Sequence, residues 1–368
     1  MLLIFCYRFD LRVGSTFVPL LTVKKQKMER RKFISDTAKF TAFTLVGASL
    51  LNNKLLASDS AFENQKLPHL KNNGSIDIFS NYQNVTTTVK LKGKDVKIHA
   101  LCTGTVAVKT NFRTKKGVGE LAKLNILLDK HYTEYLPIWV WVIEHPEGLM
   151  VIDTGENAEI KNLDKYLAKE SGFIRYQFRH ACKFNIEPKD ELNYQFEKVN
   201  LNLADVKLVA LTHMHLDHTD GLKFFPRQEI IVGDFEFNHP NNNMPSTFPS
   251  WFKPNKVKYQ QDRIDVFNEA YPITTSQDLL YIPTPGHTLG HSSIVFKTDD
   301  FDIIFAGDSS YNQGQVINGE LAGVNADYKK TKQTYDNLLA YANKRQTIYL
   351  PTHDEYAGQR LANKEFLA

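Results

Sequence analysis

The chain has 368 residues, of which 42% are hydrophobic and 23% charged, enough for a large core and for one or two domains. Its three cysteines are far apart and odd in number, which argues against a disulfide framework and against a cysteine-rich zinc module. Residues 1–57 carry 10 basic and 3 acidic side chains, whereas the other 311 residues carry 35 and 38. The net charge of +4 therefore comes from the leader, and the rest of the chain lacks the basic excess of a nucleic-acid-binding protein.

Residues 1–57 have the layout of an export signal. From Met28, a positive region at residues 30–32 precedes an apolar segment at residues 40–51, and small residues follow near Ala57. This order predicts a secretory signal peptide, and the letters RRKFI resemble a twin-arginine signal. We therefore expect an exported bacterial protein, periplasmic or secreted. The apolar segment is short for a membrane span, so no stable anchor is expected, and an uncleaved anchor or amphipathic helix is the alternative.

The rest of the chain divides into a linker and one folded domain of the α/β class. Residues 58–95 are polar, with Gly, Pro and Asn, and are expected to link the leader to the domain at residues 96–368. Alternating apolar patterns predict strands at 96–108, 138–144, 149–152, 207–211, 229–232, 279–282, 292–297, 302–306 and 347–350. Helical periodicity predicts helices near 157–170, 219–225 and 327–344.

Five of the predicted strands deliver a polar side chain to the loop that follows them. These side chains are Asp153, His213, His287, Asp308 and His353. Loops at one edge of a sheet are where such a scaffold builds a functional site. Any single histidine of the twelve is better explained as an ordinary surface or capping residue, but the ordered set is not.

The segment HMHLDH at residues 213–218 indicates a metal site. His213 and His215 are two residues apart, so they face the same way in an extended segment, and Asp217 and His218 follow where a helix should begin. Imidazole nitrogens and carboxylate oxygens suit zinc above all. Four ligands in six residues cannot easily surround one tetrahedral ion. They predict two ions that share these ligands with residues from distant loops.

The spaced motifs DTG, HMHLDH, TPGHTLGH, AGD and PTHD resemble the metallo-β-lactamase superfamily over roughly residues 96–360. The resemblance implies an αββα sandwich, with a dinuclear metal site at one edge of its sheets in a catalytic domain at 96–368. It implies that one ion is held by His213, His215 and His287, the other by Asp217, His218 and His353, and that Asp308 bridges them. Zn²⁺ is the expected metal, although manganese, iron and cobalt also occupy such sites.

Two further residues receive supporting roles from the same resemblance. Asp153 is expected to orient ligands without binding metal, as the histidines of metal sites usually require. His291, the second histidine of GHTLGH, is expected to pack or hydrogen-bond nearby.

Residues 136–156, LPIWVWVIEHPEGLMVIDTGE, resemble the N-acyl-homoserine lactonases of this superfamily, as does the sequence PTHDE. Those lactonases carry a tyrosine three residues after the bridging aspartate, where Tyr311 stands here. The resemblance implies that a metal-bound hydroxide attacks the lactone carbonyl, that Tyr311 contacts that carbonyl, and that Asp217 passes a proton to the departing alkoxide. Leu216 stands where those enzymes often have phenylalanine, and a buried structural tyrosine is the alternative for Tyr311.

The expected function is hydrolysis of the lactone ring of N-acyl-homoserine lactones. The alternatives are a hydrolase of the same fold that acts on another ester, a thioester, a β-lactam or a phosphoester, and a metal-bound sensing protein without turnover. The aromatic stretches at 172–184 and 241–256 are expected either to cover the site and receive an acyl chain, or to serve as packing or dimer segments. The resemblance also allows a homodimer, because members of the family often dimerise.

Overall fold

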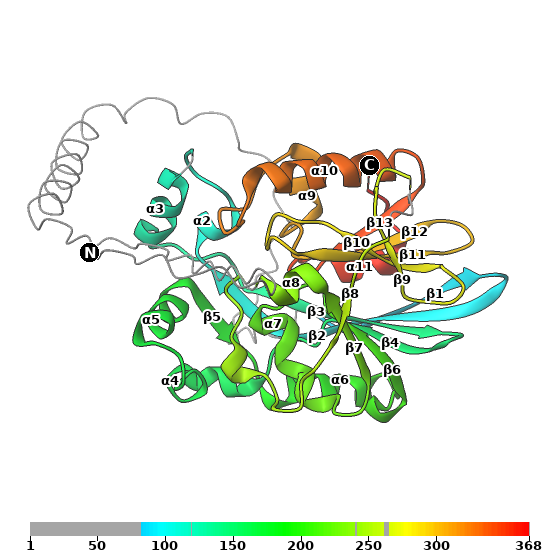
Figure 1. The fold of residues 1–368 in the computed structure, drawn as a ribbon, viewed down its shortest axis with the longest axis horizontal. Coiled ribbons are helices and arrows are strands. Elements are labelled where there is room, and N and C mark those ends of the chain that lie inside the picture. Colours follow the sequence, from blue (N-terminus) through cyan, green and yellow to red (C-terminus); the bar gives the residue numbers. More distant parts are fainter. Residues whose placement is uncertain (1–81, 119, 240, 261–264, 368) are drawn as a thin grey trace, which may run out of the picture. The chain divides into compact units, whose positions relative to one another are not determined.

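The computed structural model describes residues 82–118, 120–239, 241–260 and 265–367. The predicted export signal and most of the predicted linker lie outside these residues. Two β-sheets stand at the centre of the described part, with helices packed against both (Figure 1). Within the described residues, no helix has both the length and the apolar character that a membrane span requires.

The first sheet has eight strands in the described residues. They are β1 (Val85–Leu91), β2 (Lys94–Val108), β3 (Leu136–His145), β4 (Gly148–Ile152), β5 (Cys182–Asn185), β6 (Val206–Ala210), β7 (Glu229–Gly233) and β8 (Asn255–Val257). The order is β1-β2-β3-β4-β6-β7-β8, and β5 pairs with β2. Strands β1 to β4 pair antiparallel, whereas β4, β6, β7 and β8 pair parallel.

Strand β1 corrects the predicted boundary between linker and domain, because it joins the sheet before residue 96. The segment forms a hairpin with β2, and Lys92 and Gly93 in its turn have φ angles of 50° and 76°. Positive φ at both positions is the geometry of the tight turns that connect hairpins. The outward face of β1 carries threonine and lysine, so its sequence reads as a polar linker.

The second sheet has five strands in the described residues, in the order β13-β12-β11-β10-β9. They are β9 (Tyr271–Pro272), β10 (Leu279–Pro283), β11 (Ser292–Lys297), β12 (Asp302–Gly307) and β13 (Thr347–Pro351). Strands β12 and β13 pair parallel, so the chain must cross over between them. The crossover contains α9 (Gln313–Asn318) and α10 (Tyr328–Ala342).

The largest apolar cluster lies between the two sheets. Trp141 of β3 and Phe305 of β12 meet there, with ring centroids 5.6 Å apart. A second cluster lies between the first sheet and α6 (Leu192–Lys198), and a third lies between the second sheet and α10. The layers therefore run helix, sheet, sheet, helix, and the predicted αββα sandwich is confirmed.

Of the predicted helices, the one at 327–344 is confirmed as α10. The one near 157–170 is instead a 3-10 turn, Ala158–Asn162, followed by the short α4 (Leu163–Tyr166), because Asn162 stops the first turn and caps the second through Lys165 N–H. Near 219–225 the chain forms α7 (Leu216–Thr219) and then the 3-10 turn Asp220–Phe224. The remaining α-helices of the described residues are α2 (Thr110–Arg113), α3 (Glu120–Leu128), α5 (Gly172–Ala181), α8 (Asp234–Asn238) and α11 (Ala357–Asn363).

Replacing Phe296 by alanine should strongly destabilise the fold. Phe296 is fully buried in the cluster between the sheets, so the change removes its packing and leaves a cavity. We expect the free energy of unfolding, measured by urea denaturation, to fall by about 3–5 kcal/mol. Phe235→Ala is the matched control, because Phe235 is 45% exposed and its loss should cost less than about 1 kcal/mol. Equal losses in the two variants would contradict this assignment of the core.

Candidate metal centre

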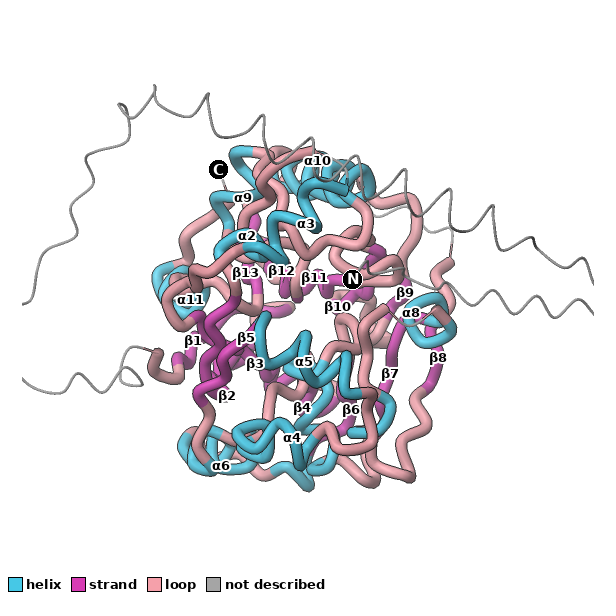
Figure 2. Tube along the Cα trace, turned by 90° about the vertical axis from the view of Figure 1, so that its left-hand side faces the viewer, coloured by secondary structure: helices cyan, strands magenta, loops and turns pink. Residues whose placement is uncertain are grey.

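The two sheets bring the predicted site residues to one edge. Figure 2 faces this edge, with α2 and α3 on one side of it and α4 and α5 on the other. From the first sheet, β4 is followed by Asp153 and β6 by His213. From the second sheet, β12 is followed by Asp308 and β13 by His353, while His287 lies on the loop between β10 and β11.

The first group of candidate ligands consists of His213, His215 and His287. The Nδ1 atom of His215 lies 3.0 Å from Nε2 of His213 and 3.0 Å from Nε2 of His287. Burial, together with the neighbouring imidazoles, holds the pKa of His213 and of His287 well below the usual value. Both rings are therefore neutral near pH 7 and keep a nitrogen lone pair, as a metal ligand must.

The second group consists of Asp217, His218 and His353. Nε2 of His353 lies 3.2 Å from Oδ2 of Asp217, and Nε2 of His218 lies 3.9 Å from Oδ1 of Asp217. His218 also forms a group with His213 and Asp308, so the two clusters are contiguous.

Asp308 reaches residues of both groups. Its Oδ1 lies 3.3 Å from Nε2 of His218, and its Oδ2 lies 3.3 Å from Nε2 of His287 and 3.4 Å from Nε2 of His353. Burial alone would raise the pKa of Asp308, but His353, His218 and His287 lower it more, and the pKa stays well below the usual value. Asp308 is therefore a carboxylate, placed where one oxygen could serve each group.

The charges on the second group follow from the same balance. Burial raises the pKa of Asp217, but His218 and His353 lower it more, to about 2. Burial lowers the pKa of His353, but Asp308 and Asp217 raise it to about 10. For His218, Asp153 and Asp308 outweigh burial and hold the pKa well above the usual value. These imidazoles therefore lie in a strongly negative field, which would equally favour a bound cation.

These residues fit divalent metal ions. Nε2 of His218 and Oδ1 of Asp308 are buried without a hydrogen-bond partner among the described residues. Leaving such groups without a partner costs about 1–3 kcal/mol each, and more where they are charged. A cation would satisfy both, and nitrogen with carboxylate oxygen is the donor set of zinc and its neighbours.

A layer of hydrogen bonds behind the ligands fixes their orientation. Oδ2 of Asp153 accepts from Nδ1 of His218 at 2.8 Å and from the Thr212 hydroxyl at 2.8 Å, while its Oδ1 accepts from Thr212 N–H at 2.7 Å. These bonds turn Nε2 of His218 toward Asp308. Nε2 of His291 accepts from Asp308 N–H at 3.0 Å, and its Nδ1 lies 2.9 Å from the hydroxyl oxygen of Thr284. Each of these two side chains contacts a candidate ligand, Asp153 through His218 and His291 through the backbone of Asp308.

Tyr311 lies at the edge of the same cluster. Its ring centroid is 5.7 Å from that of His353, and its side chain is buried. Burial and the Asp308 carboxylate hold the pKa of Tyr311 well above the usual value, so the phenol stays protonated and can donate a hydrogen bond.

The two aromatic stretches contribute to an apolar cluster around Tyr311. Leu216 and Met244 are buried in this cluster, and Ile174, Phe178 and Phe184 pack against it. The first stretch, residues 172–184, forms α5 and then strand β5, which pairs with β2. The second contains only the 3-10 turn Pro245–Thr247 and the start of β8 as regular structure among its described residues.

Glu236 is a site residue that the sequence analysis missed. It is buried in α8, and its carboxylate accepts from Met214 N–H at 3.1 Å and from the Thr288 hydroxyl at 2.7 Å. It thereby ties the loop of His213 and His215 to the loop of His287. A lone glutamate after an apolar strand carries no spacing pattern that would have revealed this role.

A family model described as the metallo-beta-lactamase superfamily matches residues 134–353. Over 287 residues the chain is 25% identical to the N-acyl homoserine lactonase AttM of Rhizobium radiobacter, covering 71% of this chain and 94% of the relative. Over 221 residues it is 24% identical to an N-acyl homoserine lactonase of Bacillus cereus, covering 60% of this chain and 82% of the relative.

Solved structures show the same fold. An N-acyl homoserine lactone hydrolase with N-hexanoyl-L-homoserine bound at its catalytic metal centre matches with a TM-score of 0.57 at 18% identity, covering 73% of this chain and 94% of that one. AidC, a dizinc quorum-quenching lactonase, matches with a TM-score of 0.51 at 15% identity, covering 75% and 92%.

Replacing Gly307 by alanine should disrupt the metal centre. Gly307 has a φ of +54°, and a Cβ there would lie 2.7 Å from Nε2 of His291 and 2.7 Å from the hydroxyl oxygen of Thr212. We expect Gly307→Ala to lower the free energy of unfolding by about 2 kcal/mol or more beyond the effect of Gly319→Ala, and to reduce the metal content of the purified protein.

Gly319→Ala is the matched control, because Gly319 has a similar φ of +66° but nothing within 4 Å of the added Cβ. Urea unfolding and elemental analysis of both variants measure the difference. If the two alanine variants lost equal stability and kept equal metal, the packing behind Asp308 would not position the site.

Proposed function

Because the chain belongs to the metallo-beta-lactamase superfamily, we propose that it is a metal-dependent hydrolase that opens the lactone ring of N-acyl-homoserine lactones and acts in quorum quenching. The observation that carries this proposal is the protonated phenol of Tyr311 beside the histidine and aspartate cluster, with its ring 5.7 Å from that of His353. The relatives named N-acyl homoserine lactonases, which the chain matches over most of their length, support the same reaction.

The donor groups support two divalent ions. His213, His215 and His287 would hold one, Asp217, His218 and His353 would hold the other, and Asp308 would contribute to both. Nitrogen and oxygen donors favour zinc, and manganese, iron and cobalt suit the same set. When bound, the ions would polarise the lactone carbonyl and lower the pKa of a water molecule toward about 7.

The residues of the chain have two tasks in the reaction. Tyr311 donates its phenolic hydrogen to the carbonyl oxygen, which becomes negative when water adds to the carbonyl carbon. Asp217 accepts a proton from that water and passes it to the ring oxygen when the ring C–O bond breaks. The product is the ring-opened N-acyl homoserine, with one water added. The Oδ1 atom of Asp217 suits this role, because it lies 3.9 Å from Nε2 of His218, whereas Oδ2 lies only 3.2 Å from Nε2 of His353.

The apolar cluster beside Tyr311 supports an acylated substrate. Leu216 and Met244 belong to the same apolar cluster as Tyr311, and Phe178 from α5 packs against it, so together they form an apolar wall. An acyl chain against this wall would exclude water from the carbonyl. The smaller Leu216 in place of phenylalanine leaves more room for the chain.

Export is the second part of the proposal. Residues 30–32, 40–51 and 57–58 have the order of a signal peptide, and they lie outside the described residues. An exported enzyme would meet diffusible lactones outside the cytoplasm. Fractionation of cells that produce the full chain, followed by mass measurement of the mature form, tests this step.

The test of the reaction uses the full chain loaded with zinc. Ring opening of N-hexanoyl-homoserine lactone releases acid and can be followed in a pH-stat. We expect turnover that chelation abolishes and that Asp308→Ala lowers together with metal content. Full metal binding without lactone opening would contradict the lactonase proposal and favour another ester, a thioester, a β-lactam or a phosphoester as substrate.

Tyr311→Phe should lower kcat by about 10²–10³-fold, the size found when one donor to a developing oxyanion is removed. Metal content should not change, because Tyr311 is not among the residues proposed to hold the ions. Tyr335→Phe is the matched control, since the buried hydroxyl of Tyr335 has no hydrogen-bond partner among the described residues. Steady-state kinetics should show a normal kcat for this control, and an unchanged kcat in Tyr311→Phe would remove Tyr311 from the mechanism.

A further inference from the structure

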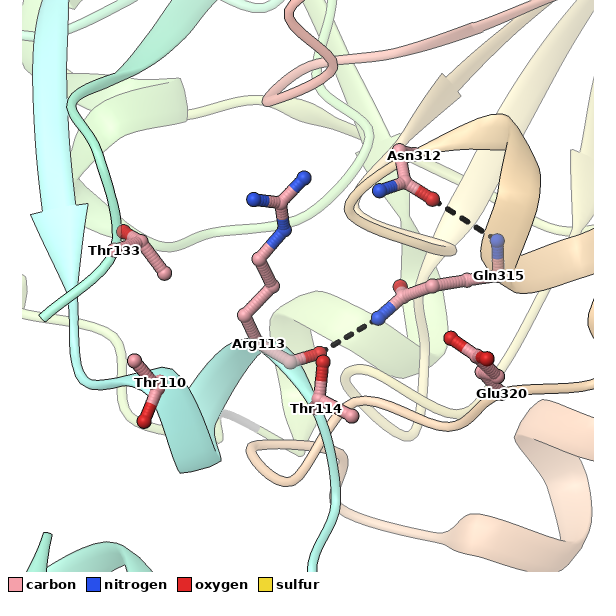
Figure 3. Close-up of a pocket in the computed structure, with 7 residues that line it drawn as sticks. All are labelled: Thr110, Arg113, Thr114, Thr133, Asn312, Gln315 and Glu320. Carbon is pink, nitrogen blue, oxygen red and sulfur yellow. Dashed lines mark hydrogen bonds between the residues drawn. The ribbon is translucent and has the colours of Figure 1, made fainter. Parts of the chain in front are cut away.

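A polar pocket of about 350 Å³ lies between α2 and α9, lined by residues that include Arg113, Asn312 and Gln315 (Figure 3). The pocket lies close to Tyr311, because Gln315, which lines it, accepts a hydrogen bond from Tyr311 N–H at 2.9 Å. Asn312 follows Tyr311 in the chain, and the ion-pair partner of Arg113 is Glu355, two residues after His353. Tyr311 also belongs to the apolar cluster that would contact an acyl chain.

The backbone carbonyl of Arg113 is fixed by a hydrogen bond, and its side chain extends into the pocket (Figure 3). The Gln315 side chain donates from Nε2 to the Arg113 carbonyl at 2.6 Å and accepts from Tyr311 N–H at 2.9 Å, so it ties α2 to the catalytic tyrosine. The guanidinium makes one side-chain contact among the described residues, from Nη1 to Oε1 of Glu355 at 3.3 Å. A guanidinium has five N–H donors, so most of them are free for a ligand.

Asn312 adds a further donor. Its Oδ1 accepts from Gln315 N–H at 2.9 Å, which leaves its amide nitrogen pointing toward Arg113 across the pocket (Figure 3). Two donor groups, one from α2 and one from the residue before α9, therefore face the same space.

The charges around the pocket indicate which group these donors would bind. Glu355 pairs with Arg113, and the Glu320 carboxylate also lines the pocket, so two negative charges face one positive charge. A free carboxylate or phosphate would be repelled. A neutral oxygen would gain a hydrogen bond from a charged donor, and a plain alkyl chain would cover the guanidinium without giving it a partner.

We propose that Arg113 and Asn312 form a subsite for a keto or hydroxyl oxygen on the acyl chain, so that the protein prefers oxygen-substituted acyl lactones over unsubstituted ones. This inference rests on the proposed lactonase function. A hydroxyl fits the subsite best, because it can accept from Arg113 and donate to Glu355.

The test compares three lactones on the zinc-loaded full chain: N-hexanoyl, N-3-oxohexanoyl and N-3-hydroxyhexanoyl homoserine lactone. We expect kcat/KM for the substituted pair to exceed that for the plain lactone by about ten-fold or more, as one hydrogen bond from a charged donor provides. Arg113→Met should reduce this ratio to less than about three-fold, because it removes the charged donor and keeps a side chain of similar length. Lys116→Met, which removes a charge from the same segment outside the pocket, should keep the wild-type ratio.

A ratio that is the same in wild type and Arg113→Met would overturn the subsite while the lactonase function stood. If no lactone were opened, the proposed function would fail, and calorimetric titration of the same three lactones would test the subsite alone. Tighter binding of the hydroxyl compound that Arg113→Met abolishes would support the subsite even then. Equal affinity for the three compounds, or no binding, would overturn it.

Discussion

The burial of the Asp308 carboxylate among imidazoles is the constraint on which the site depends. An ionised carboxylate cannot be buried without positive partners, and here His218 and His353 supply them from two different loops, one following each sheet, while the neutral ring of His287 also contacts the carboxylate. Each of these loops follows or joins strands of one of the two sheets, so both sheets must pack correctly before the charge is compensated. The apolar core between the sheets and the polar cluster at their edge therefore stabilise each other.

Hydrogen bonds from neighbouring buried residues hold the candidate ligands in this arrangement. Asp153 fixes His218, His291 fixes the backbone of Asp308, and Glu236 joins the two histidine loops. Each of these groups is itself buried and satisfied, which limits the rotamers open to the ligands. A site prepared in this way loses little entropy when cations bind, because few side chains have to be ordered.

Much of the fold and most of the candidate site could be predicted because their signals are local. The spacing of His213 and His215, and the polar residues after apolar strands, follow from the period of a strand, which needs no tertiary information. Strand β1 was missed because its outward threonines and lysines resemble a linker, and α5 with β5 because a short amphipathic helix beside a four-residue strand reads as a loop. Glu236 and Gln315 could not be found, since each acts through single contacts to residues distant in sequence.

The candidate metal ligands and the walls beside Tyr311 are formed by different residues. Two proteins with the same ligands could therefore differ in substrate. In the proposed reaction, the candidate ligands would determine where a carbonyl is polarised and where charge develops. The walls beside Tyr311 are set separately: Leu216 and Met244 are apolar, whereas Arg113 and Asn312 are polar donors. Gln315 connects the polar wall to Tyr311, because it accepts from Tyr311 N–H and donates to the Arg113 carbonyl. Under the proposed function, a change in the Arg113 side chain would alter substrate choice without moving a candidate ligand. Selectivity can therefore diverge in α2 and α9 while the buried carboxylate and its imidazoles stay fixed.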